Sequence, residues 1–460
     1  MKSNYLFLYS YLFLVVFTSC KKFVDIPPPP TELVGQDAFN SDPSATAALV
    51  GIYSNMMSTT GFASGGPQSI TQLTGASADE FINYSTDPNQ GAFYKNDLIS
   101  SNLIVGNNLW NEGYKLIYYA NAVLEGLNSS TAISDSNRTQ LIGEAKFIRA
   151  FCHFYLVNLF GDIPLITTTN YQLNAIAVRT PAHNVYVQII SDLKDAQSKM
   201  SPDYSFSYGE RVRPNKWTAA ALLARVYLYL QDWTNASIEA TSIINNTSLY
   251  NLSPNLNTVF LANSEEAIWQ LMPVQPGFNT QEGETFILTD APQYVAITPD
   301  LQNAFESGDN RKADWLDSFT TNGLTYYFAY KYKVKASADL TEYSIVFRLS
   351  EQYLIRAEAE AQQNDLTNAA VDLNIIRSRA GLLNSTALSQ SDLLAAISHE
   401  RQIELFSEWG NRWFDLKRTH FADSVLGPIK GPGWQANDTL YPIPREEINK
   451  DPRLTQNQGY

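Results

Sequence analysis

Two glutamates near the carboxy-terminal end of the chain have a spacing that acid–base chemistry can use. Glu400 and Glu404 lie four residues apart, so they share one face of a helix, and paired carboxylates can cleave a glycosidic bond. However, neighbouring arginines are expected to lower the pKa of both carboxylates, whereas a catalytic acid needs a raised pKa. We therefore predict no catalytic residue and interpret the run as arginine–carboxylate pairs that hold a helix against a loop. Its members are Glu400, Arg401, Glu404, Arg412, Asp415 and Arg418.

Cys20 is the other residue whose setting points to chemistry, here lipid attachment. Lys2 precedes an almost unbroken apolar stretch over residues 5–17, and small residues stand directly before the thiol, as in a secretory signal. The stretch is shorter than the roughly 20 residues of a transmembrane helix. A cysteine at the cleavage point resembles a bacterial lipobox, so we predict a signal peptide over 1–19 and acylation of Cys20 that anchors the protein to membrane lipid. A plain secretory signal with an incidental cysteine is the alternative.

The residues after Cys20 predict a tether. Residues 20–36 include four consecutive prolines at 27–30, which favour an extended polyproline II segment and would hold a folded body away from a bilayer.

The sequence contains no recognisable metal-binding or cofactor-binding motif. The histidines are scattered, the single cysteine besides Cys20 is Cys152 in an apolar helix, and no glycine-rich phosphate loop is present. We predict no metal site, no cofactor and no internal disulfide. The hydrophobic content of 44% predicts a large core, and the net charge of −14 argues against a nucleic-acid partner.

Helical periodicity dominates the body of the chain. Apolar residues recur at helical spacing over 42–57, 110–127, 141–160 and about 185–200, and Pro214 stands where another helix begins. These segments predict a mostly α-helical fold.

Two later segments share an internal pattern. Residues 223–240 and 353–376 each carry a small residue, Ala224 or Ala357, followed by an acidic turn at Asp232 or Asp365 and a second, alanine-containing helix. Both look like tetratricopeptide helix–turn–helix units, and their named residues are expected to serve core packing.

Several blocks, read in order, make the chain resemble the SusD/RagB family, the nutrient-capturing surface lipoproteins of Bacteroidetes. The blocks span residues 20–460 in the order that the family has. They are CKKF at 20–23, EAKFIRAF at 144–151, LFGDIPL at 159–165, RLSEQYLIRAEA at 348–359, ERQIEL at 400–405, RWFDLKR at 412–418, YPIP at 441–444, EIN at 447–449 and QNQGY at 456–460.

That resemblance implies a fold and a role. The fold would be a mostly α SusD-like domain over 37–460, with tetratricopeptide-like helix pairs and an irregular, loop-rich insert at about 250–345. The protein would sit on the outer face of the outer membrane, bind a glycan without chemistry on it, and hand it to a SusC-like TonB-dependent transporter.

Two irregular segments fit sugar chemistry best, because sugars stack on aromatic rings and need polar side chains for their hydroxyls. They cover residues 78–96 and 273–333, and loops this long usually have a function. The candidate ligand-binding residues are Phe81, Asn83, Tyr84, Tyr94, Tyr294, Trp315, Tyr326 and Tyr327.

Two other functions stay open at this point. The chain could be a helical-repeat scaffold or lid of the transporter that binds a non-carbohydrate nutrient. It could also be a lipid-anchored glycosidase, which we disfavour because no isolated carboxylate pair is evident.

Overall fold

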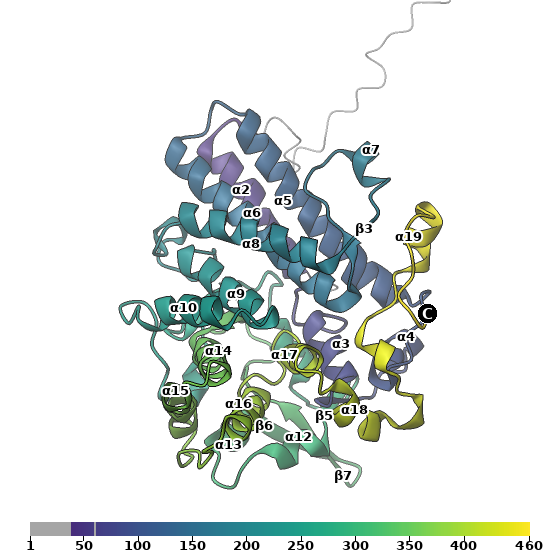
Figure 1. Cartoon of the computed structure of the whole chain (residues 1–460), viewed down its shortest axis with the longest axis vertical. Helices are drawn as coiled ribbons and strands as arrows, with labels where there is room; N and C mark the ends of the chain where they lie inside the picture. The colour runs from purple at the N-terminus through teal and green to yellow at the C-terminus, as the bar shows by residue number, and fades with distance from the viewer. Residues whose placement is uncertain (1–37, 59–60) are drawn as a thin grey trace, which may run out of the picture.

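The computed structural model describes residues 38–58 and 61–460 of the chain. Helices form most of this part, and short strands form the rest (Figure 1). The mostly α-helical fold class is confirmed. The predicted signal peptide, Cys20 and the proline-rich tether lie outside the described residues. Within them, no helix is both long enough and apolar enough to cross a membrane.

Four helices lie side by side in the upper part of the molecule in Figure 1. They are α2 (Asp42–Met56), α5 (Glu112–Ser129), α6 (Asp135–Phe160) and α8 (Ala182–Lys199). Helix α6 contacts the other three, and its aromatic carboxy-terminal half is buried. All four predicted helices are confirmed with shifted bounds; α5 follows a π-helical turn, η3 (Val105–Asn111), so the helical path there begins earlier than expected.

The two predicted repeat units have the same turn. Helices α9 (Lys216–Tyr229) and α10 (Trp233–Ile244) form the first pair, and α14 (Leu349–Gln362) and α15 (Leu366–Arg379) form the second. Gln231 and Asn364 take the left-handed conformation, with φ of 59° and 65°. Asp232 and Asp365 then cap the second helix, each accepting a hydrogen bond from the backbone N–H three residues later. The helical-repeat prediction is confirmed for both segments.

The carboxy-terminal helices complete the helical part. They are α16 (Gln390–Glu404), α17 (Asn411–Arg418), α18 (Ala422–Lys430) and α19 (Arg445–Lys450). Helix α16 packs on α14 and α15, while α17 reaches α3 (Ile70–Ser77) near the amino-terminal end of the described chain. The carboxy-terminal segment therefore joins the repeats to the loop-rich side.

In the part of the chain that the structure describes, the strands form four two-stranded antiparallel sheets. Each strand is two to six residues long. The pairs are β1 (Phe81–Asn83) with β5 (Val295–Ile297), β2 (Ile163–Pro164) with β3 (Arg179–Thr180), β4 (Ala267–Leu271) with β8 (Ser344–Arg348), and β6 (Leu316–Thr321) with β7 (Leu324–Ala329). The predicted insert at about 250–345 thus contains ordered strands.

Short helices lie between these strands. They are α4 (Pro88–Lys95), α7 (Tyr171–Asn174), α11 (Gln281–Phe286), α12 (Pro299–Ala304) and α13 (Asn310–Trp315).

An aromatic cluster joins the central helix to the β4–β8 ribbon. The rings of Phe147 and Phe151 on α6 meet Trp269 of β4 edge to face, with centroids 5.2 and 5.6 Å apart. Phe347 of β8 stacks on Trp269 at 6.2 Å. All four rings are buried, so this cluster forms a large part of the core between helices and strands.

The charged carboxy-terminal run forms buried ion pairs, as predicted. Glu404 is fully buried and accepts hydrogen bonds from Arg311, Arg348 and Arg379. These arginines lie on α13, at the end of β8 and at the end of α15. We call this group the Glu404 cluster. Its second carboxylate is Glu266, which pairs with two of the same arginines.

The remaining members of the run also pair. Arg401 binds Asp415 at 2.7 Å, Arg412 binds Asp79 at 2.6 Å, and Arg418 binds both Glu358 and Asp415. One detail of the prediction is wrong. The surrounding arginines lower the pKa of Glu404, but burial outweighs them at Glu400 and raises its pKa.

Glu404→Gln should destabilise the protein strongly. The substitution keeps the shape but leaves three buried guanidinium groups with one carboxylate fewer, which typically costs roughly 3–5 kcal/mol of unfolding free energy. Urea denaturation of the full chain measures this change. The exposed Glu446 on α19 provides the control, since Glu446→Gln should change stability by less than about 0.5 kcal/mol. Equal stability of both variants would contradict a structural role for the Glu404 cluster.

Candidate ligand-binding site

The two irregular segments predicted to bind a ligand meet through the β1–β5 ribbon. Phe81 pairs with Ile297 and Asn83 with Val295. Just beyond the ribbon, the Tyr84 N–H donates to the carbonyl oxygen of Tyr294 at 2.7 Å. Residues about two hundred positions apart are therefore held side by side by backbone hydrogen bonds.

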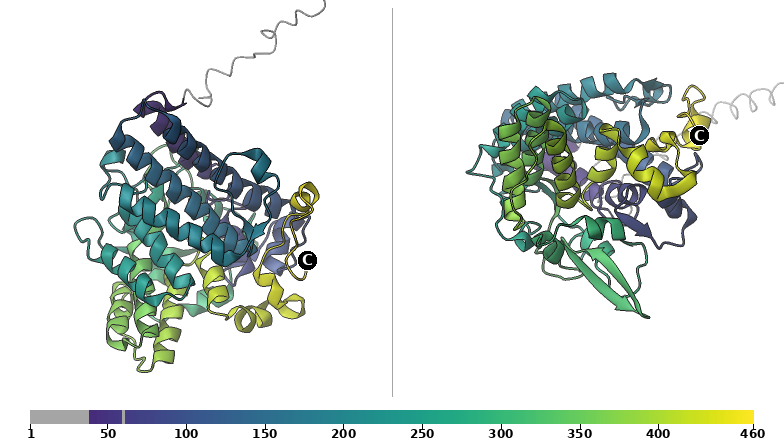
Figure 2. Two further views of the ribbon diagram at one scale, coloured as in Figure 1. Left: turned by 45° about the horizontal axis from the view of Figure 1, so that its top comes forward. Right: turned by 60° about the horizontal axis from the view of Figure 1, so that its bottom comes forward.

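A pair of tyrosines marks the surface of this junction. The rings of Tyr84 and Tyr326 meet edge to face with centroids 5.4 Å apart. Tyr326 lies on β7, whose hairpin with β6 projects from the body in the right-hand view of Figure 2. Tyr84 is 38% exposed and Tyr326 is partly buried. One ring therefore faces solvent while its neighbour holds it in place.

Tyr94 of α4 belongs to the same surface. Burial raises the pKa of the Tyr84 phenol, and the nearby Tyr326 and Tyr94 hydroxyls raise it further, so the three phenols lie within electrostatic range. The Tyr84 hydroxyl is protonated at neutral pH, as any phenol with an ordinary pKa of about 10 is, and can donate a hydrogen bond. We name Tyr84, Tyr94 and Tyr326 the tyrosine cluster; Tyr294 contributes its backbone carbonyl oxygen, which accepts from the Tyr84 N–H.

Lys430 supports the cluster and was missed by the sequence analysis. Its ammonium group lies 4.8 Å from the centre of the Tyr94 ring and donates to the carbonyl oxygens of Tyr94 and Ala76. Burial lowers its pKa to about 8. No local signal identifies this lysine, because it lies at the end of α18, more than 300 positions from the residues it holds.

Asn83 provides a polar group beside the rings. Its Nδ2 donates to the Ser85 carbonyl oxygen at 3.1 Å. Its Oδ1 is buried and has no hydrogen-bond partner among the residues that the structure describes. A buried acceptor without a partner is unusual, and its burial keeps it from a ligand at the surface.

Phe81 and Trp315 do not present a ring to a ligand, so these two predictions are wrong. Phe81 is 1% exposed and stacks on Phe286 with centroids 5.2 Å apart. Trp315 is fully buried, donates to the Leu256 carbonyl oxygen and lies under the Lys331 ammonium group at 4.8 Å. Both rings belong to the core.

Tyr327 is exposed but lies apart from the cluster. Side chains alternate along a strand, so Tyr327 and Tyr326 project from opposite faces of the β6–β7 hairpin. Tyr327 therefore serves as an internal comparison for Tyr326.

Glu400 and Glu404 cannot reach a bound polymer. Their side chains are at most 1% exposed, and both form salt bridges with Arg311. A search of residues 38–58 and 61–460 finds no group of three or more His, Cys, Asp or Glu side chains arranged to hold a metal ion.

Comparison with known proteins assigns the fold and the family. Residues 41–228 match a family model described as "Starch-binding associating with outer membrane", and residues 297–460 match the model of the SusD family. SusD-like protein P2 of Formosa agariphila is 31% identical over 411 aligned positions, which cover 76% of this chain and 80% of that protein. This chain belongs to the SusD family.

Solved structures of other SusD proteins share the fold. A SusD superfamily protein from Bacteroides vulgatus superposes with a TM-score of 0.79 at 20% identity, covering 92% of this chain and all of that one. A structure described as a laminarin-binding SusD-like protein gives a TM-score of 0.75 at 23% identity, covering 92% of this chain and all of that one. The SusD/RagB resemblance read from the sequence blocks is confirmed.

Glu80 fixes β1, and therefore the tyrosine cluster, to the carboxy-terminal segment. It is buried, and one carboxyl oxygen accepts a hydrogen bond from the Ser407 N–H at 3.1 Å. Burial, assisted by the neighbouring Asp79, raises its pKa from 4.5 to about 8. The folded state therefore binds this proton more tightly than the unfolded state does. Its stabilising effect is complete below about pH 4.5 and is lost as the pH rises through about 8.

Glu80→Gln should remove this pH dependence. The unfolding free energy of the wild type minus that of Glu80→Gln should fall between about pH 5 and pH 8, by up to about 1.4 kcal/mol per pH unit. Urea titrations across this range measure the difference, and Glu446→Gln should give a flat line. Parallel curves for the wild type and Glu80→Gln would show that Glu80 does not titrate in this window.

Proposed function

We propose that this protein captures a glycan at the cell surface through the tyrosine cluster and delivers it to a SusC-like TonB-dependent transporter. The observation that carries the proposal is the exposed Tyr84 ring, held edge to face by Tyr326 on a projecting hairpin. A sugar can place its C–H face on such a ring while the phenol hydroxyls bond its own hydroxyls.

The family comparisons support a carbohydrate ligand. One matching family model carries a starch-binding description, and one neighbour of the same fold is described as laminarin-binding. The side chains of the tyrosine cluster select the glycan that this chain binds. The polymer and its linkage are identified by direct binding measurements.

The side chains of the tyrosine cluster suit the binding of a glycan rather than its cleavage. The cluster's titratable side chains are phenols beside one buried ammonium group, and the paired carboxylates of a glycosidase are not among them. We infer a binding protein without enzymatic activity, anchored to the outer membrane by acylated Cys20 and facing the cell exterior.

A screen against polysaccharides and oligosaccharides tests the proposal. Retention of residues 21–460 in affinity gels, followed by calorimetry, should identify one preferred glycan. Tyr84→Ala and Tyr326→Ala should each weaken that binding about tenfold, since a lost stacking contact costs roughly 1–1.5 kcal/mol.

Tyr327→Ala is the matched control, because it removes the same ring from the other face of the hairpin and should leave the affinity unchanged. Equal losses for Tyr326→Ala and Tyr327→Ala would contradict a site at the cluster. Retention on no glycan would favour a non-carbohydrate nutrient or a structural lid on the transporter.

Cys20→Ala should release the protein from the membrane. The substitution removes the thiol that we expect to carry the lipid, so incorporation of labelled palmitate should be lost and the protein should leave the membrane fraction. Cys152→Ala is the control: Cys152 is buried in α6, and its loss should not change the labelling. A labelled, membrane-bound Cys20→Ala variant would refute the anchor.

A further inference from the structure

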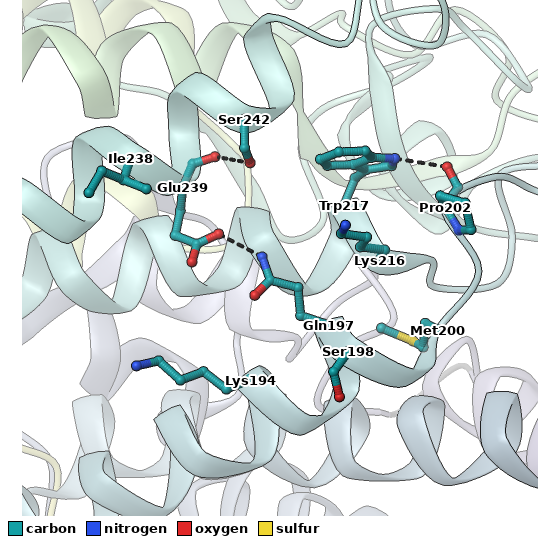
Figure 3. Close-up of a pocket in the computed structure, with 10 residues that line it drawn as sticks. All are labelled: Lys194, Gln197, Ser198, Met200, Pro202, Lys216, Trp217, Ile238, Glu239 and Ser242. Atoms are coloured by element: carbon teal, nitrogen blue, oxygen red, sulfur yellow. Dashed lines mark hydrogen bonds between the residues drawn. The ribbon is translucent and has the colours of Figure 1, made fainter.

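A concave surface lies on the helical repeats, away from the tyrosine cluster. Helices α8, α9 and α10 enclose a groove of about 670 Å³, within the range of small-molecule sites (Figure 3). None of its lining residues belongs to the tyrosine cluster. The side chains that matter for the argument are Lys194, Gln197, Lys216, Trp217, Glu239 and Ser242.

Trp217 forms one wall of this groove and is fixed in orientation. Its indole N–H donates to the Pro202 carbonyl oxygen at 2.8 Å, and the residue is only partly buried. The Lys216 ammonium group lies 5.1 Å from the ring centre. An indole held in this way lines the groove with a cation over one of its faces, and an aromatic face can receive the C–H face of a sugar.

The positive charges of the groove exceed its negative charges. In the part of the chain that the structure describes, Lys194 and Lys216 form no salt bridge, whereas the nearby Lys146 and Lys199 both pair with Asp195. The one carboxylate, Glu239, already accepts a hydrogen bond from Gln197 at 2.7 Å, as Figure 3 shows. Two lysines without a salt bridge, set against the single carboxylate of Glu239, leave a local excess of positive charge in a chain with a net charge of −14.

We propose that this groove is a second glycan site, selective for an acidic sugar that carries a carboxylate or a sulfate ester. The ring of Trp217 would receive the sugar, while Lys194 and Lys216 would bind its anionic group. The Gln197 amide on α8 and the Ser242 hydroxyl on α10 line the same groove and can bond neutral hydroxyls. A neutral glycan would leave both ammonium groups without a salt bridge, so the groove should discriminate against it.

Calorimetry of residues 21–460 with three tetrasaccharides tests this proposal. The probes are tetragalacturonate, a sulfated galactan tetrasaccharide and neutral maltotetraose. One or both acidic probes should bind at least tenfold more tightly than the neutral one, and the affinity should fall with added salt. The acidic probe that binds more tightly shows whether the groove prefers a carboxylate or a sulfate ester.

Three variants locate the binding. Lys194→Gln/Lys216→Gln and Trp217→Ala should each weaken acidic binding at least tenfold. Lys115→Gln/Lys450→Gln removes the same charge elsewhere and should have no effect. The Tyr84→Ala/Tyr326→Ala variant should keep acidic binding, which separates failure of the groove from failure of the tyrosine cluster. No binding of either acidic probe, or equal losses in the two lysine variants, would overturn the proposal.

Discussion

The structure depends on one buried carboxylate surrounded by arginines. Glu404 binds Arg311, which lies within the loop-rich insert, and Arg348 and Arg379, which lie on two elements after it. Charges this deep are tolerated only when each is paired, so a shift of any element would leave an unpaired charge in the core at a cost of several kcal/mol. The cluster therefore locks the second helix pair, α16 and the insert into one arrangement.

The same carboxy-terminal segment also holds both halves of the candidate site. On one side, the Ser407 N–H donates to Glu80 and Arg412 pairs with Asp79, immediately before β1. On the other side, Lys331 follows β7 and donates to the Glu404 carbonyl oxygen at 2.8 Å. The loops that carry Tyr84 and Tyr326 are thus anchored to a common rigid segment, although they are distant in the sequence. A binding surface on loops gains precision from such a support.

The parts of the fold that local chemistry decides could be predicted from the sequence. Helices follow from periodicity, and the repeat turns follow from Asp232 and Asp365, whose caps depend on neighbours within three residues. Strand pairing could not be predicted, because β1 is three residues long and its partner lies about two hundred positions away. The same pairing decides which rings are exposed: it buries Phe81 and leaves Tyr84 at the surface, a distinction that residue type alone cannot supply.

The tyrosine cluster and the groove on α8, α9 and α10 differ in the charge that they present to a ligand. At the tyrosine cluster, the partly buried Lys430 lies against the Tyr94 ring and donates to backbone carbonyl oxygens, so the cluster itself presents neutral phenols. In the groove on α8, α9 and α10, the lysines are not used in this way and the Trp217 ring stands beside them. An acidic protein repels anionic polymers over most of its surface, so a local excess of cations fixes where such a polymer can approach. The helical repeats can therefore contribute binding chemistry of their own while they also form the rigid frame.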